Sequence, residues 1–308
     1  MLYVVTCIFN PRGFKSRYTL YRDFAPYIEY CGAKLLTVEV AFDGRPFEVT
    51  TPGNPWNLQL RTNHELWHKE RALNLGIQHL LKLDPNAKYV AWIDADVTFT
   101  NPHWVEDTIK ALHHYCVIQL FSQAQNLLPN YEMQWSCSSR FHTYCTKKGY
   151  HQRPPKHLKY ISGGHPGLAW AARIETLDQL GGLFDKSITG SGDTYMANAL
   201  SGDVIFNSKP GMSEGFRKAL LIWQDACDRH VKKNVGFIWG ACLHYWHGKS
   251  SKRGYDKRWD ITSFHQYDPF EDIKVGVNGL YQFVGNKKEL EYDLRLSFSE
   301  RDEDSTAV

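Results

Sequence analysis

Two aspartates separated by one residue follow a short apolar stretch near residue 90. Asp94 and Asp96 come directly after Tyr89–Ile93, whose composition predicts a strand buried on both faces. In open α/β sheets, ligands bind beyond the carboxyl ends of the strands. Two carboxylates at such an end can converge on one divalent cation and on the phosphates that the cation holds. A single D-x-D pattern is short and common in proteins. The alternative to a metal site is therefore that the two aspartates form an ordinary turn at the end of the strand.

Two histidines lie much later in the chain, in the stretch Leu243–His247. Neutral imidazole is a good ligand for a divalent transition metal. In one continuous strand His244 and His247 would point to opposite faces, so both can bind one metal only if the chain turns there. The cations that follow, Lys249 and Arg253 among them, can hold a diphosphate or an anionic acceptor. The alternative is a packed aromatic cluster followed by a solvated basic loop.

Glycines precede a further aspartate. Gly163 and Gly164 are adjacent, and Gly190–Asp193 has the sequence Gly-Ser-Gly-Asp. Adjacent glycines let the backbone approach a ligand closely. Asp193 lies where a helix should begin, so its carboxylate either caps that helix or faces a cleft.

Strand and helix patterns alternate along the first part of the chain. The expected strands cover 2–9, 35–42, 89–93 and about 116–121, and the expected helices cover about 17–31, 65–83 and 102–114. Ser16 is expected to cap the first helix, and Pro26 to kink or shorten it. This alternation predicts an α/β fold with a parallel sheet between helices. We also expect a late buried strand over 235–246 and a frayed acidic tail over 300–304.

Composition and cysteine usage restrict the class of protein. The 308 residues are 43% hydrophobic and 22% charged, with a formal net charge of +3, which indicates a globular protein and excludes a polybasic one. The seven cysteines are odd in number and contain no C-x-x-C pair, so a reducing compartment fits better than a disulfide framework. The N-terminus has no signal-peptide pattern and no stretch approaches a membrane span. We therefore expect a cytoplasmic protein, in the host cytoplasm if the gene belongs to a phage.

The order of these motifs resembles a GT-A-fold glycosyltransferase, in particular β-1,4-galactosyltransferase-like enzymes and the phage-encoded transferases similar to them. Arg71–Gly76 resembles that family's R-A-x-L-L-N-x-G helix, Asp94-Ala95-Asp96 its D-x-D motif, and Gly163-Gly164 its double glycine before the donor sugar. Gly192-Asp193 and Leu243–His247 stand where the family has W-G-x-G-G-E-D-D and M-x-x-H. The resemblance covers about residues 1–260. The chain departs from the family at the reduced Gly-Ser-Gly-Asp and at His244, which replaces methionine.

The resemblance implies a single GT-A (Rossmann-like) domain with a mixed, mainly parallel central sheet flanked by helices. Residues 1–125 would form the nucleotide-sugar-binding half, ending in the D-x-D region. Residues 126–270 would form the acceptor and metal-binding half, and residues 271–308 a C-terminal extension with an acidic tail.

The resemblance also implies roles for individual residues. Asp96 would bind Mn²⁺ or Mg²⁺ with His247 and, as a second histidine, His244, and Asp193 would be the general base. The expected donor-binding residues are Asn10, Pro11, Arg12, Glu39, Lys69, Arg71, Asn74, Asp94, Gly163, Gly164, Lys249 and Arg253.

The resemblance therefore implies a metal-dependent glycosyltransferase. It would move a sugar from a nucleotide-sugar donor, most simply a UDP-sugar, to a hydroxyl acceptor. A divalent ion and nearby cations would stabilise the leaving diphosphate, and a carboxylate would take the proton of the attacking hydroxyl. No second carboxylate stands out as a nucleophile, which favours inversion. The alternatives are a non-catalytic module that binds nucleotide sugars or nucleic acid, and a nucleotidyltransferase, which would show a glycine-rich phosphate loop after the first strand.

The acceptor is suggested by the segment 133–174, which contains no aspartate or glutamate. Its seven cations are Arg140, Lys147, Lys148, Arg153, Lys156, Lys159 and Arg173, interleaved with aromatic residues. Cations suit a phosphate backbone and aromatic rings suit an unstacked base. With the basic loop 249–258, this segment makes a hydroxymethylated pyrimidine in DNA a candidate acceptor. A glycan, a lipid-linked sugar or a protein is the alternative.

Overall fold

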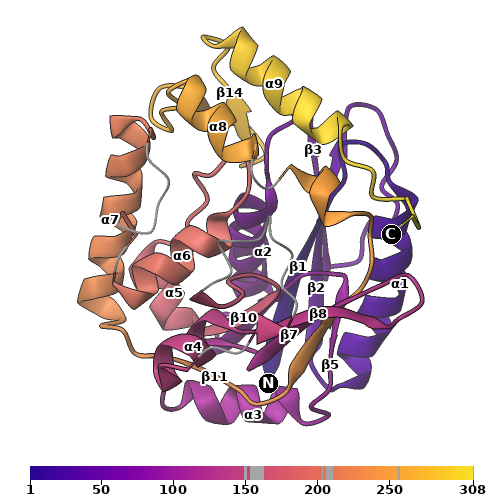
Figure 1. Cartoon of the computed structure of the whole chain (residues 1–308), viewed down its shortest axis with the longest axis vertical. Helices are drawn as coiled ribbons and strands as arrows, with labels where there is room; N and C mark the ends of the chain where they lie inside the picture. The colour runs from indigo at the N-terminus through magenta and orange to yellow at the C-terminus, as the bar shows by residue number, and fades with distance from the viewer. Residues whose placement is uncertain (149–150, 153–162, 203, 206–210, 255–256, 308) are drawn as a thin grey trace.

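The computed structural model describes residues 1–148, 151–152, 163–202, 204–205, 211–254 and 257–307 (Figure 1). A seven-stranded sheet forms its centre. In spatial order its strands are β11 (Val235–Phe237), β6 (Val117–Gln119), β10 (Ala169–Arg173), β4 (Tyr89–Ile93), β1 (Leu2–Phe9), β2 (Lys34–Phe42) and β3 (Asn57–Thr62). All neighbouring strands are parallel except β10, which is antiparallel to both β4 and β6. This confirms the expected α/β fold with a mixed, mainly parallel sheet.

Helices cover both faces of this sheet (Figure 1). One face is covered by α2 (Lys69–Leu83), α4 (Arg140–Thr146), α5 (Ile174–Leu180), α6 (Gly192–Ser201) and α7 (Glu214–His230), and the other by α1 (Lys15–Tyr30) and α3 (Trp104–Leu112). Successive side chains of a strand point to opposite faces, so Val4 and Val5 of β1 belong to different buried clusters. Gly76 lets α2 lie close to the sheet, because a Cβ there would come within 2.6 Å of the Val5 side chain.

A second, five-stranded sheet lies beyond the carboxyl end of β4. Its spatial order is β5 (Val97–Phe99), β12 (Ala241–His244), β7 (Gln123–Leu127), β8 (Met133–Ser138) and β9 (His151–Gln152). The chain passes from β4 of the large sheet to β5 of the second sheet through Asp94–Asp96. His244 ends β12, opposite Val97 of β5. The predicted D-x-D and histidine motifs therefore meet where the two sheets adjoin.

The C-terminal part of the chain returns to the N-terminal half. It contains the 3₁₀ helix η2 (Ser250–Arg253), α8 (Lys257–Phe264), the antiparallel pair β13 (Ile273–Val275) and β14 (Tyr281–Phe283), and α9 (Lys288–Ser299). After α9 the chain descends toward α1, so the C-terminus lies beside the N-terminal end of that helix (Figure 1). None of the helices described is both long and apolar enough to cross a membrane.

Two expectations about the C-terminal part are wrong. The stretch 235–246 is not one strand: β11 joins the large sheet and β12 the second sheet, with a break at Gly240, whose φ is 130°. The tail 300–304 is not frayed, because Glu303 is 4% exposed and bonded on several sides. The acidic composition of the tail predicts that it is exposed to solvent. Its burial could not be predicted, because one of the basic partners of Glu303 is Arg17, which is far away in sequence.

The expected helix boundaries also need correction. Ser16 lies inside α1 and its side chain does not cap the helix; the carboxylate of Asp304 instead accepts hydrogen bonds from the backbone N–H groups of Lys15 (3.0 Å) and Ser16 (2.8 Å). Pro26 does not end α1, which continues to Tyr30. The helix expected over 65–83 begins at Lys69.

Candidate active site

A cleft lies beyond the carboxyl ends of β1 and β4. Its floor consists of Cys7–Phe9 and Asp94–Asp96. Its walls include Trp67, Lys69, Glu70, His165–Leu168, Ser191, Asp193, Thr194, His244, His247, Arg253, Arg258, Trp259, Arg17 and Arg301. Seven of the predicted site residues therefore line this cleft together: Lys69, Asp94, Asp96, Asp193, His244, His247 and Arg253.

Asp96, His244 and His247 form a cluster with metal-ligand geometry. One ligand atom from each lies within 4.8 Å of the other two. Nε2 of His247 is 3.1 Å from Oδ2 of Asp96, and Nε2 of His244 is 3.8 Å from the same oxygen. Because β12 ends at His244, the chain turns after it and both rings face Asp96, which is the condition that their spacing imposed. A carboxylate with two imidazoles suits a divalent transition metal.

Burial supports this assignment. Asp96 is 4% exposed, and its Oδ1 has no hydrogen-bond partner among the described residues. A buried carboxylate oxygen without a partner is costly unless it binds a cation. Burial, and then the charges of Arg17 and Arg253, lower the pKa of His247 to about 4, so its ring is neutral at pH 7 and can donate a lone pair. These residues therefore fit a divalent metal ion.

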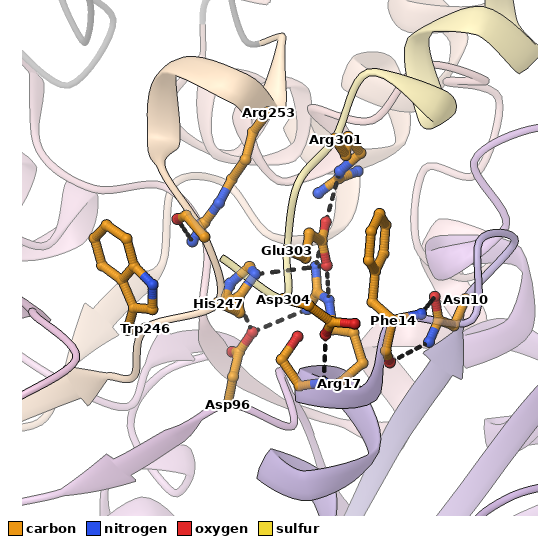
Figure 2. Close-up of polar contacts among 12 residues, drawn as sticks. Asn10, Phe14, Arg17, Asp96, Trp246, His247, Arg253, Arg301, Glu303 and Asp304 are labelled. Atoms are coloured by element: carbon orange, nitrogen blue, oxygen red, sulfur yellow. Dashed lines mark hydrogen bonds and ion pairs between the residues drawn. The ribbon is translucent and has the colours of Figure 1, made fainter. Parts of the chain in front are cut away.

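The acidic tail contacts this cluster (Figure 2). Arg17 donates from Nη1 to Oδ2 of Asp96 at 3.0 Å and also forms an ion pair with Glu303. Arg301 pairs with Glu303 at 2.6 Å. Oε2 of Glu303 lies 3.6 Å from Nδ1 of His247. The tail is thus part of the wall of the candidate metal site.

A second group of charges lies around Lys69, the first residue of α2. Its Nζ forms an ion pair with Asp94. Burial alone would lower the pKa of Lys69, but the carboxylates of Asp94 and then Glu70 raise it. The Lys69 amine is therefore protonated and positively charged at neutral pH. Glu70 is 4% exposed, and burial raises its pKa to about 7, opposed by Lys69 and reinforced by Asp193. The cleft therefore holds a carboxyl group that is partly protonated near neutral pH.

Asp193 lies in the first turn of α6, where Ser191 is the N-cap residue. Its Oδ1 accepts a hydrogen bond from the backbone N–H of Thr194 at 2.7 Å. Its Oδ2 lies against Gly167, where any Cβ would overlap it. The carboxylate lines the cleft and is oriented by the start of the helix and by the space that Gly167 leaves.

The predicted residues after β1 lie beside the main cleft. Asn10, Pro11 and Arg12 line a small cavity that shares Arg17 and Arg301 with the cleft. The side chain of Asn10 exchanges hydrogen bonds with the backbone of Phe14 (Figure 2), and Arg12 forms an ion pair with Glu65. These contacts shape the loop, and a role of the three residues toward a nucleotide stays a prediction.

Several residues that were predicted to bind the nucleotide-sugar donor do not line the cleft. Glu39 is 3% exposed and accepts hydrogen bonds from Glu48, Val49 and Thr50, so its carboxylate holds the loop after β2. Arg71 and Asn74 are not among the lining residues of the cleft; both bond Asp185, and Asn74 also bonds the backbone of Leu183. Lys249, which precedes η2, is not among the lining residues.

The double glycine also has a packing role. A Cβ at Gly164 would meet the backbone of Ser139 at 2.5 Å, and one at Gly163 would overlap the side chain of Arg140. The backbone approach that the glycines permit is to the start of α4, and neither glycine is among the described lining residues.

Other lining residues were not predicted at this site. Arg17, Trp67 and Glu70 carry no local signal that separates them from ordinary surface or core residues. Arg258 belongs to the basic loop 249–258, and Arg301 and Glu303, which lines the small cavity, belong to the tail that was expected to be frayed. His165 directly follows the double glycine, and that position could have marked it. Its Nδ1 accepts a hydrogen bond from the backbone N–H of Gly167 at 3.2 Å, and burial lowers its pKa to about 4.

The described cations of segment 133–174 have different surroundings. Arg140 packs against Gly163. Lys147 lies over the ring of Tyr144, with Nζ 4.2 Å from its centroid. Arg173 is paired with Tyr89, at the end of β4 opposite the cleft. Arg153, Lys156 and Lys159 lie outside the described residues.

No family model matches the chain, and no curated protein matches its sequence. Among solved structures, the catalytic domain of Drosophila β1,4-galactosyltransferase 7 in complex with xylobiose is 10% identical over 94% of this chain and 97% of that chain, with a TM-score of 0.42. A mutant of the same enzyme in complex with manganese, UDP-Gal and xylobiose is 12% identical over 94% and 72%, with a TM-score of 0.33. A putative nucleotide-diphospho-sugar transferase from Desulfovibrio desulfuricans G20 is 9% identical over 95% and 97%, with a TM-score of 0.34. Similarities of this size assign no activity or substrate to this chain.

Proposed function

We propose that this chain is a metal-dependent glycosyltransferase that moves a sugar from a nucleotide-sugar donor, a UDP-sugar in the simplest case, to a hydroxyl acceptor. One observation carries the proposal: a single cleft contains a carboxylate–imidazole–imidazole cluster and, on a different element, the carboxylate of Asp193. A metal cluster alone would also suit a binding protein. The additional carboxylate at a helix start supplies the base that transfer to a hydroxyl requires.

Asp96, His244 and His247 would hold Mn²⁺ or Mg²⁺. Such an ion stabilises the negative charge that develops on the diphosphate when the sugar–phosphate bond breaks. Arg253 and Arg301 line the cleft near this cluster and add positive charge for the diphosphate. Asp94, fixed by its ion pair with Lys69, would orient the ribose or the sugar.

Asp193 would accept the proton of the attacking hydroxyl. Gly167 and the backbone of Thr194 fix its carboxylate, so it can be oriented before the acceptor arrives. Besides Asp193 and the proposed metal ligand Asp96, two carboxyl groups line the cleft: Glu70 is buried and its pKa of about 7 leaves it partly protonated near neutral pH, and Asp94 forms an ion pair with Lys69. The proposal gives neither of them the role of a covalent nucleophile, and it includes inversion at the sugar carbon.

A hydroxymethylated pyrimidine in DNA is the acceptor that we propose to test first. The basic and aromatic composition of 133–174 supports it, and Arg258 with Trp67 and Trp259 extends positive charge and aromatic surface to the cleft wall. Arg258 lies 6.0 Å from the ring centroid of Trp67. The dispersed positions of Arg140 and Arg173 weigh against a DNA cradle made of the whole segment.

The test incubates the purified chain with Mn²⁺, a panel of nucleotide sugars and one acceptor class at a time, followed by mass spectrometry. Acceptors are DNA containing hydroxymethylated pyrimidines, free glycans, lipid-linked sugars and peptides. A sugar-sized mass gain that Asp193→Asn removes supports the transferase. Gain only on a glycan or peptide would exclude DNA and keep the transferase, whereas no gain on any acceptor and no donor hydrolysis would favour a binding module.

A further inference from the structure

Glu303, in the acidic tail, lies beside the metal site of the proposed function, on which the following proposal rests. We propose that Glu303 is a positioning residue of that site, which orients the His247 ring so that its Nε2 faces the metal. The C-terminal tail would then complete a site whose ligands lie at or just beyond the ends of β4 and β12.

The two nitrogens of His247 have different surroundings. Nε2 faces the other ligand atoms, 3.1 Å from Oδ2 of Asp96 and 3.2 Å from Nε2 of His244. Nδ1 is buried, has no hydrogen-bond partner among the described residues, and lies 3.6 Å from Oε2 of Glu303. A ring that binds a metal through Nε2 keeps its proton on Nδ1, and such rings usually donate that proton to a carboxylate or carbonyl. At 3.6 Å the separation is longer than a hydrogen bond, and a small ring movement toward Glu303 would close it.

The tail around Glu303 is fixed to the segment that carries His247. Trp246, immediately before the histidine, donates from Nε1 to the backbone oxygen of Ser305 at 2.6 Å. Gly248, immediately after it, leaves the space through which the backbone of Asp302 passes, since any Cβ there would overlap the Asp302 oxygen. Figure 2 shows Glu303 and His247 facing each other within this arrangement. The carboxylate is thus positioned relative to the ring from both sides.

Charge pairing also fixes the carboxylate itself. Glu303 is 4% exposed and lies between the guanidinium groups of Arg17 and Arg301. A carboxylate held this way keeps its orientation and its negative charge. A purely structural role, in which Glu303 only joins these arginines, would explain its burial but would not require it to affect metal binding through His247.

The test measures Mn²⁺ binding by electron paramagnetic resonance, with no donor or acceptor present, so it is independent of sugar transfer. The variants are Glu303→Ala, His247→Ala and the two combined, with Asp304→Asn as the matched control. Asp304 is the neighbouring acid of the same tail, and its carboxylate bonds the start of α1. Thermal unfolding of each variant is followed, and Glu303→Gln, which keeps the shape, replaces Glu303→Ala if the latter is unfolded.

Glu303→Ala should weaken Mn²⁺ binding about 10- to 100-fold, the usual effect of removing the carboxylate behind a metal-bound histidine. Asp304→Asn should leave the affinity within about twofold, and Glu303→Gln should cause a smaller loss than alanine because an acceptor oxygen remains. The double variant should bind no more weakly than His247→Ala, because Glu303 acts through that ring.

Three results would overturn the inference. Unchanged Mn²⁺ affinity in Glu303→Ala, or a double variant whose loss is the product of the two single losses, would show that Glu303 does not act through His247, while the metal site itself would stand. No Mn²⁺ binding by the unaltered chain would overturn the metal site and the inference together.

Discussion

The Nε2 atoms of His244 and His247 lie 3.2 Å apart, and Oδ2 of Asp96 is within 3.8 Å of both. Two nitrogens at this separation cannot both carry a proton directed at the other, so at least one lone pair is available inside the cluster. Nη1 of Arg17 lies 3.0 Å from the same oxygen and offsets part of the negative charge of the carboxylate. A divalent ion would offset the rest. Three possible ligand atoms from two different strand ends thus converge on one point.

Asp96→Ala should remove metal-dependent activity without unfolding the chain. Asp96 would contribute a metal ligand at the cleft, and Arg17 keeps Glu303 as an ion-pair partner when the Asp96 carboxylate is removed. We expect turnover to fall by roughly 10²–10³ and Mn²⁺ binding to be abolished. Steady-state kinetics and Mn²⁺ titration check this, with the exposed Glu106→Gln as a control. Wild-type rates in Asp96→Ala, or in the presence of a strong chelator, would contradict the metal site.

Asp193→Asn should lower turnover while leaving the metal site intact. The amide has the size of the carboxylate and can still accept from Thr194, but it cannot take the proton of a hydroxyl. We expect turnover to fall by roughly 10²–10⁴ with donor affinity near normal. If donor affinity falls instead and turnover does not, Asp193 belongs to the donor site.

Gly167→Ala should act on Asp193 without touching its charge. The new methyl group would overlap Oδ2 of Asp193, and the φ of Gly167 is one that alanine can adopt. A base displaced by about 1 Å can cost about 10²-fold in rate. Turnover should therefore fall while Mn²⁺ affinity is unchanged. Gly44→Ala is the matched control, because nothing lies within 4 Å of its Cβ position, and equal rates in the two variants would contradict the prediction.

The sequence predicts the parts of the site that follow from local pattern. The apolar strand before Asp94 predicts that both aspartates lie at the carboxyl edge of a sheet. The spacing of His244 and His247 indicates that the chain must turn between them if both rings are to face one metal. Glu303 could not be predicted, because its burial depends on Arg17 and on the return of the chain after α9. The contacts of Glu39 could not be predicted either, because no local signal shows that backbone N–H groups nine to eleven residues later bond its carboxylate.

Glu70→Gln should stabilise the protein at high pH. Burial raises the pKa of Glu70 from 4.5 to about 7, so between these values the native state binds more protons than the unfolded state. The Glu70 contribution to the free energy of unfolding is therefore largest below pH 4.5 and is lost as the pH rises toward 7. Relative to wild type, the variant should gain up to about 3 kcal/mol at pH 8 and almost nothing at pH 4.5. Urea unfolding at both pH values measures this, and a difference that does not vary with pH would contradict it.

The salt dependence of DNA binding tests the acceptor. Lys147 and Lys148 follow α4 and are exposed. They are two adjacent cations in the described part of segment 133–174. If they bind phosphates, the double change to serine should flatten the slope of log affinity against log salt by about 0.9 for each phosphate that is no longer neutralised. The KM for DNA should rise and the KM for the donor should not. Lys232 and Lys233 are the matched control: they are also exposed after a helix, Lys232 has a positive φ like that of Lys147, and they lie beside the start of β11. Equal slopes for both double variants and wild type would remove this pair from the DNA surface, and no binding of duplex DNA by wild type at low salt would favour an uncharged acceptor.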